Sequence, residues 1–250
     1  MSDLMGLVFC IWCSAFCIPE DVGSVYEQMR LLRDAGAECE RLPSTILAGY
    51  PMSDHLKVSI RKEFTGSLGL LAASNVWEVE LHCDREELVR LIGAVHHDVF
   101  TLRLHPKESS KLPPALLSRF TRLSEVSFAR VESPDELLAG CTKSRATLNR
   151  LEIDEVELDS LQLRTIAEAA PQVTSMTMRD CEFNGLSVRD LLPFKRLERL
   201  SVANADFSAK DILMIENRTK FRAMKIKSGV LLFERTVNDV GEWKRGAAGL

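Results

Sequence analysis

Apolar side chains recur along this chain in triplets, at the first, fourth and sixth positions of a repeated unit. Successive triplets start 23 to 25 residues apart, and all their positions are apolar although only 46% of the chain is. A period of this length predicts a repeat architecture in which neighbouring units cover one another's apolar sides. The seven triplets are Val76-Val79-Leu81, Val99-Leu102-Leu104, Leu123-Val126-Phe128, Leu148-Leu151-Ile153, Val173-Met176-Met178, Leu197-Leu200-Val202 and Phe221-Met224-Ile226.

Each triplet predicts a short β-strand, because side chains alternate between the two faces of a strand. We expect the fourth and sixth positions to point into the core, and the third, fifth and seventh to point away from it. Later apolar positions in each unit predict a helix that returns on the other side, as over residues 161–170 and 188–194. These positions are Leu158, Phe183, Phe207 and Leu231, ten residues after the starts, and Leu117, Ile166, Leu191 and Ile215, eighteen after.

The unit that begins at Leu148 shows the pattern as Leu148-x-x-Leu151-x-Ile153-x-x-Val156-x-Leu158. This pattern and its period resemble the leucine-rich repeat family over residues 76–232. The resemblance implies an α/β fold: a horseshoe-shaped solenoid with a parallel β-sheet on its concave face and helices on its convex face. The family's Asn or Cys at the ninth position is present only as Cys181, so we expect no regular asparagine ladder. The intracellular, helix-backed type of repeat is the one that the chain resembles.

The chain divides into three parts on this basis. Residues 1–75 lack the triplet in register and are expected to form a helical amino-terminal cap, with a helix over 20–37 and a degenerate first repeat that contains a strand at 56–60 and a helix over 66–73. Residues 76–232 are expected to form about seven repeats. Residues 233–250 are expected to form a carboxy-terminal cap or tail, because repeat arrays need their end units covered.

Composition and charge narrow the function classes. The chain has 250 residues, with 32 basic and 36 acidic side chains, so its net charge of −4 gives no general attraction to nucleic acid or anionic lipid. The seven cysteines form no disulfide framework, and Cys10, Cys13 and Cys17 are expected to pack in a buried helix. We therefore expect a cytoplasmic or nuclear protein that does not insert into a membrane. A secretory signal within the apolar residues 4–18 is the disfavoured alternative, because a basic flank is missing.

The outward positions of the predicted strands carry most of the candidate binding chemistry. They are acidic in the first unit, mixed in the middle and basic at the end, which favours recognition of a partner protein through the concave face. Trp77 and Phe100 stand at the edge of this face, as partner anchors or, in the preferred interpretation, covered by the amino-terminal segment. The candidate partner-binding residues are Glu78, Glu80, Arg103, Glu125, Arg150, Glu152, Arg179, Arg199, Lys225 and Lys227.

Histidines offer a further candidate site. His82 and His105 hold the seventh position in adjacent units, beside Glu80, and we interpret them as ordinary surface residues rather than as a pH-sensitive pair or a metal site. The neighbouring His96 and His97 are expected on a helix, pointing in different directions, and also at the surface. No phosphate-binding loop, nucleophile elbow or zinc-peptidase motif occurs. The sequence thus predicts no enzyme activity, no cofactor and no metal.

The leading hypothesis is a non-catalytic adaptor that binds another protein. One alternative is a substrate-recognition subunit of a ubiquitin ligase, because Ile18-Pro19-Glu20-Asp21-Val22 and the following apolar stripe resemble the start of an F-box; Met29 would then face the ligase scaffold. A second alternative is a regulator of a GTPase or another enzyme. A third is a ribonucleoprotein assembly factor, although an aromatic content of 6% argues against direct RNA stacking.

Overall fold

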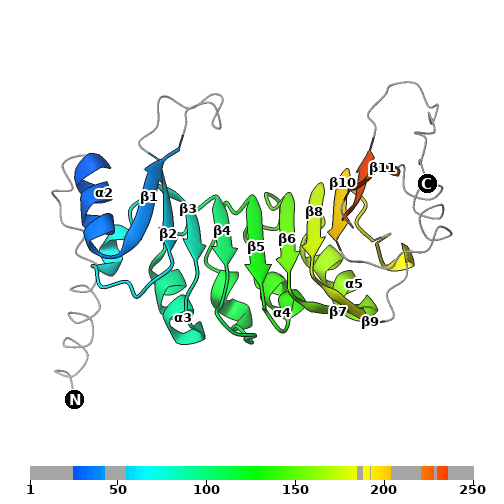
Figure 1. Ribbon diagram of the computed structural model, residues 1–250, viewed down its shortest axis with the longest axis horizontal. Helices are drawn as coiled ribbons and strands as arrows, with labels where there is room; N and C mark the ends of the chain where they lie inside the picture. The colour runs from blue at the N-terminus through cyan, green and yellow to red at the C-terminus, as the bar shows by residue number, and fades with distance from the viewer. Residues whose placement is uncertain are drawn as a thin grey trace, which may run out of the picture.

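A computed structural model of the chain shows an α/β fold built on one mostly parallel, open β-sheet (Figure 1). It describes residues 25–42, 55–184, 188–191, 193–203, 221–227 and 230–235. Ten strands form the sheet within these ranges. In spatial order they are β1 (Ala37–Arg41), β2 (Leu56–Ile60), β3 (Val76–Leu81), β4 (Thr101–Leu104), β5 (Glu125–Ala129), β6 (Arg150–Asp154), β8 (Ser175–Arg179), β10 (Arg199–Ala203), β12 (Val230–Arg235) and β11 (Phe221–Lys227).

In the run from β2 to β10 each strand is parallel to the next, and from β3 onward the strands pair residues at the same repeat position. Glu78 pairs with Thr101, Thr101 with Glu125, and Glu125 with Arg150. All eighteen residues of the first six triplets are at most 3% exposed. The predicted strands, their direction and their buried positions are therefore confirmed for these six units. The parallel strand at 56–60, expected in a degenerate first repeat, is confirmed as β2.

Helices cover one side of the sheet. α3, α4 and α5 lie in a row along that side, and α2 packs beside β1 (Figure 1). Their buried side chains join the inward strand residues in one apolar core, as Leu91, Leu138 and Ile166 do. The helices are α2 (Val25–Asp34), α3 (Arg85–Ala94), α4 (Pro134–Ala139) and α5 (Ser160–Ala169), with 3₁₀ turns η2 (Leu68–Leu70), η3 (Pro114–Leu117) and η4 (Val188–Leu191).

Two of the three helices expected on the return path or in the first repeat differ from the prediction. α5 matches the helix expected over 161–170, and its first turn is capped by Asp159, whose carboxylate accepts from the Gln162 N–H while the Gln162 side chain accepts from Asp159 N–H. Among the described residues of 188–194 the structure instead has the short turn η4, and 66–73 has the short turn η2. Apolar spacing alone does not separate a 3₁₀ turn from an α-helix over so few residues.

Backbone geometry also recurs from unit to unit. Arg130, Glu155 and Asp180 hold the same position directly after successive strands, and all three have positive φ angles, of 55°, 51° and 50°. Beyond them, β7 (Glu157–Asp159) and β9 (Glu182–Asn184) form a small parallel sheet. The units are thus alike in conformation as well as in apolar pattern.

The two ends of the sheet depart from the predicted parallel array. β1 is antiparallel to β2, and β12 lies between β10 and β11, antiparallel to both. The seventh triplet therefore does not form a parallel strand beside β10, which corrects the expectation of seven stacked repeats. The physical reason is the short connection between β11 and β12, because a parallel pair needs a long crossover whereas a hairpin does not. Residues 1–24 and 236–250, where the cysteine helix, the F-box-like segment and the tail were expected, lie outside the described ranges.

Candidate binding face

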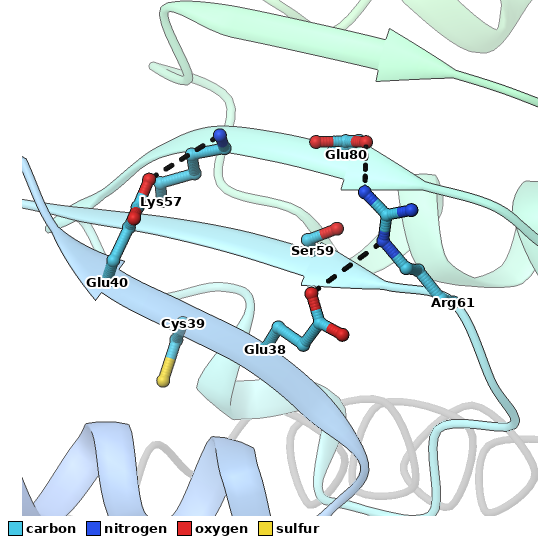
Figure 2. A pocket seen from close by; sticks show the side chains of 7 residues that line it. All are labelled: Glu38, Cys39, Glu40, Lys57, Ser59, Arg61 and Glu80. Carbon is cyan, nitrogen blue, oxygen red and sulfur yellow. Dashed lines mark hydrogen bonds and ion pairs between the residues drawn. The ribbon is translucent and has the colours of Figure 1, made fainter.

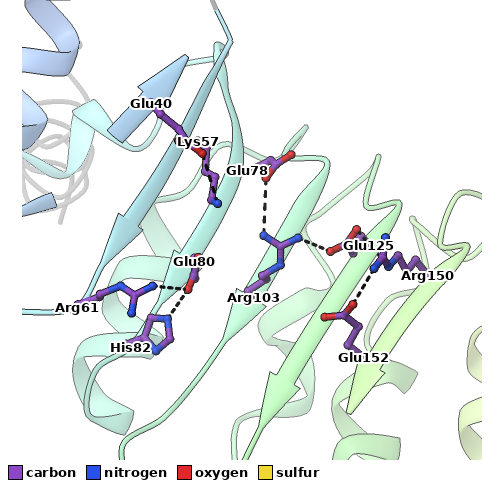
Figure 3. A network of polar contacts seen from close by, with 10 residues as sticks. All are labelled: Glu40, Lys57, Arg61, Glu78, Glu80, His82, Arg103, Glu125, Arg150 and Glu152. Atoms are coloured by element: carbon purple, nitrogen blue, oxygen red, sulfur yellow. Dashed lines mark hydrogen bonds and ion pairs between the residues drawn. The ribbon is translucent and has the colours of Figure 1, made fainter. Parts of the chain in front are cut away.

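The sheet has a second face, opposite the helices, which we call the open face. Strand alternation directs the third and fifth residues of each unit there, because the first, fourth and sixth point into the core. Seven ionisable side chains from five successive strands meet on this face and form a continuous series of ion pairs, the ion-pair chain, most of which Figure 3 shows. Its members are Glu78, Arg103, Glu125, Arg150, Glu152, Arg179 and Asp154.

The distances show how each arginine bridges carboxylates. Arg103 lies 3.8 Å from Glu78 and 2.5 Å from Glu125. Arg150 lies 3.7 Å from Glu125 and 3.0 Å from Glu152. Beyond the strands shown in Figure 3, Arg179 lies 3.8 Å from Glu152, and it donates from Nε to Asp154 at 2.9 Å. The ion-pair chain thus links β3 to β8 through side-chain contacts.

Carboxylates and guanidinium groups differ in exposure. The four carboxylate side chains are 14–19% exposed, whereas Arg150 and Arg179 are 51% and 50% exposed. Burial raises the pKa of Glu78 above its usual range, despite the positive charges of Arg103 and Lys57. Burial likewise raises the pKa of Asp154, which the hydrogen bond from Arg179 opposes. The open face therefore presents guanidinium groups that rest on covered carboxylates, and the first unit is less acidic at its surface than its sequence predicts.

A polar cavity of about 150 Å³ continues this face towards β1. Figure 2 shows Lys57 beside Glu40, and Arg61 between Glu38 and Glu80. Lys57 Nζ lies 3.5 Å from Glu40, and the Arg61 guanidinium lies 3.7 Å from Glu38 and 3.1 Å from Glu80. The Ser59 hydroxyl is buried on the floor between them and has no hydrogen-bond partner among the described residues. Cys39 points the other way, towards α2, where its thiol lies 3.3 Å from the Met29 carbonyl oxygen.

Glu80, His82 and His105 lie together at the edge of the open face where β3 and β4 end. The His82 and His105 rings are stacked with their centroids 4.4 Å apart and their planes at 6°. His82 Nε2 lies 2.5 Å from Glu80 Oε1 (Figure 3). Burial, together with the charge of His82, lowers the pKa of His105 to about 4. Their proximity agrees with their equal positions in adjacent units, because parallel register places equivalent residues of neighbouring strands side by side.

The opposite edge, where the strands begin, carries the two aromatic residues singled out in the sequence. Trp77 is buried under Leu42 and stacks on the His55 ring at 3.5 Å, so the amino-terminal segment covers it as expected. Phe100 remains 38% exposed. Met29 on α2 is buried in the core, which removes it as a contact for a ligase scaffold.

Seven of the ten predicted binding residues are joined in ion pairs on the open face. Arg199 lies on β10, in register with Ser175. Lys225 and Lys227 lie on β11, which β12 separates from Arg199 on β10. Their side chains are outside the described part, so the basic end of the face stays a prediction. Sequence reasoning missed Glu38, Glu40, Lys57 and Arg61, which precede the repeat. The available signal was the strand predicted at 56–60, in which the polar residues Lys57 and Ser59 alternate with apolar ones.

His96 and His97 follow the end of α3 rather than lying within it, and their rings meet at 4.3 Å, which corrects their predicted divergence. Among the described cysteines, Cys83, Cys141 and Cys181 are buried free thiols, as the sequence predicts.

None of the described helices has the length and apolar character needed to cross a membrane. Comparison of the chain with protein-family models, curated proteins and solved structures yields no match.

Proposed function

We propose that this chain is a leucine-rich-repeat protein that binds a partner protein through its open face. Three features support the repeat assignment: the spacing of 23 to 25 residues, the pairing of equivalent positions in adjacent strands, and the positive φ angles at equivalent positions after β5, β6 and β8. In such an array the open face corresponds to the concave face. That face is where solenoid proteins commonly bind their partners.

The observation that carries the proposal is the ion-pair chain on the face that no described helix covers. Arg150 and Arg179 are each held by two carboxylates, yet half of each side chain is exposed. A guanidinium group has five N–H donors, so donors remain for a carboxylate of the partner. Because the arginines are already positioned, binding would cost little additional side-chain entropy.

The chemistry of the face also defines the kind of partner. The face is polar and charged, and its outermost groups are cationic, which favours an acidic or polar segment of a protein. The cavity beside Lys57 and Arg61 continues the polar face to β1, but there Glu38 and Glu40 are the more exposed groups, at 74% and 66%. We expect association to be faster and tighter at low salt, because exposed charges are screened over about 10 Å at 0.1 M ionic strength.

Charge reversal tests the proposal. The full chain and a variant with Arg150→Glu and Arg179→Glu are used as baits in affinity capture from a native cell extract, and bound proteins are quantified by mass spectrometry. The control bait carries Lys143→Glu and Arg196→Glu, which change the net charge equally but lie in exposed turns before β6 and β10. Circular dichroism checks that all three baits are folded.

The proposal predicts a stoichiometric protein partner that is retained by the control bait and lost from the open-face variant. Equal recovery of that partner with both variants would place the contact elsewhere and overturn the proposal. Loss of the partner from the control bait alone would also contradict it.

A further inference from the structure

The backbone places Glu80, His82 and His105 in fixed positions on the open face. Glu80 and His82 are two residues apart along β3 and its extension, so their side chains share one face. The His82 N–H donates to the Ile60 carbonyl and the His105 N–H to the Leu81 carbonyl, both at 2.8 Å. The strand ladder thus continues through both histidines, and the three side chains meet because of regular pairing.

The side chains offer three ligand atoms close to one point. One nitrogen from each histidine and a carboxylate oxygen of Glu80 all lie within 4.8 Å of one another. Zinc ligands at about 2.0–2.2 Å in a tetrahedral site are separated by about 3.3–3.6 Å. Side-chain rotations that move these atoms by about 1 Å would therefore give coordination geometry, with no change in the strands.

We propose that Glu80, His82 and His105 bind a divalent transition-metal ion of the zinc class. Two imidazoles and one carboxylate are a ligand set that zinc uses with three protein ligands, and they leave a fourth position for water or an external ligand. All three side chains are half-buried, so the ion reaches the site from the open face. This inference does not depend on partner binding.

The protonation states favour coordination. The low pKa of His105 keeps its imidazole neutral near pH 7, as a metal ligand requires. Burial opposes ionisation of Glu80, but the hydrogen bond from His82 and the charges of His82, Arg61 and Lys57 outweigh it and lower the pKa of this carboxyl. Coordination by His82 Nε2 and Glu80 Oε1 would replace the hydrogen bond between these two atoms.

Nearby cations set the strength of the site. Arg61 contacts the same oxygen of Glu80 at 3.1 Å and also lies 3.7 Å from Glu38. When the ion binds, Arg61 can move from Glu80 towards Glu38, so its charge stays paired. Arg103, two residues before His105, and Arg130, in the next unit, act on His105 and also oppose a cation. We therefore expect weaker binding than at a closed structural zinc site.

A second group, His96, His97 and Asp98, fits a metal less well. The Asp98 carboxylate accepts a hydrogen bond from the Thr121 hydroxyl, and His96 Nδ1 accepts from the Asp98 N–H at 3.2 Å. His96 Nδ1 is therefore held by a backbone N–H, and His97 is exposed, whereas all three side chains of the first group are partly buried. This group supplies a control, because it also contains two histidines and one carboxylate.

Calorimetric titration of the full chain with Zn²⁺ alone tests the inference. We compare the wild type with Glu80→Gln, His105→Gln and the control His97→Gln, and we record the visible spectrum of each with Co²⁺ as the probe. We expect Glu80→Gln and His105→Gln each to lower the affinity for one equivalent of zinc by at least about 10-fold. His97→Gln should bind zinc as the wild type does. The Co²⁺ bound at this equivalent should show nitrogen and oxygen ligation without thiolate charge-transfer bands.

Folding controls keep the result decisive. Glu80→Gln keeps the size of the side chain and an oxygen that accepts from His82, so it should fold even if His105→Gln is destabilised; urea unfolding checks both. An absence of zinc uptake by the wild type overturns the inference. Equal affinity in wild type and Glu80→Gln, or thiolate ligation of every bound ion, overturns it as well.

Discussion

Replacing Arg103 with methionine is the sharpest test of the ion-pair chain. The Arg103 side chain is 26% exposed and lies between Glu78 and Glu125, which are 17% and 14% exposed. Methionine keeps much of the apolar stem but removes the charge and the donors. Two largely covered carboxylates would then lose their shared partner.

The expected loss of stability follows from this partial burial. Removing one member of a fully buried ion pair costs about 3–5 kcal/mol, whereas exposed pairs contribute about 0–1 kcal/mol. The intermediate exposure places Arg103→Met at about 2 kcal/mol. Without Arg103, burial raises the pKa of Glu78 further, so the variant binds a proton more readily when folded than when unfolded. The loss in unfolding free energy relative to the wild type should therefore shrink as the pH falls through the folded-state pKa of Glu78.

Urea unfolding of the full chain, followed by circular dichroism at several pH values, measures these effects. Arg196→Met is the control, because this arginine is exposed in the turn before β10, and it should change stability by less than about 0.5 kcal/mol. Glu125→Gln in the Arg103→Met background should recover part of the loss, giving a coupling energy of about 0.5–3 kcal/mol. Equal stability of Arg103→Met and Arg196→Met would refute the reasoning.

Three further predictions concern titration, packing and thiol burial. Because the folded pKa of His105 is about 4, against an ordinary value of 6.5, the unfolded chain binds the extra proton, and stability is lost as the pH falls from about 6.5 to 4; His105→Gln should flatten part of this slope in urea unfolding. A Cβ at Gly140 would lie 2.0 Å from the Pro114 carbonyl oxygen, so Gly140→Ala should lower stability by about 1–3 kcal/mol. Gly93→Ala, which meets open space in α3, should raise it by about 0.5–1 kcal/mol, and an equal effect of the two alanines in thermal melts would contradict this account. Burial raises the pKa of Cys141 to about 12, so iodoacetamide should label it near pH 7 only after unfolding, as mass spectrometry of native and denatured samples would show.

The central part of the fold follows from the apolar pattern because burial acts on every unit alike. Strand residues such as Leu151 and Ile153 are apolar because they lie in the core between the sheet and the helices, where water is excluded. The ends obey a different constraint. Phe221, Met224 and Ile226 match the triplet, yet they form the outer strand of a hairpin, because the pattern records burial and not the identity of the neighbouring strand.

The site was predictable in its residues but not in its contacts. Alternation placed Arg103, Arg150 and Arg179 on one face, and the structure confirms this. Their pairing with carboxylates depends on side-chain reach across strands about 4.8 Å apart, which a list of positions does not contain. The stacking of His82 on His105 is a similar case, because equal repeat positions predict proximity while ring orientation depends on packing.

The most direct test of the proposed function is the affinity of the purified partner for the chain, measured by calorimetry at two salt concentrations. The account predicts that Arg150→Glu with Arg179→Glu raises the dissociation constant by at least about 10-fold, equivalent to about 1.4 kcal/mol of binding free energy. The double substitution should also reduce the salt dependence of binding. The control variant with Lys143→Glu and Arg196→Glu should bind as the wild type does. Unchanged affinity in the open-face variant, or the same loss in the control, would contradict recognition through the open face.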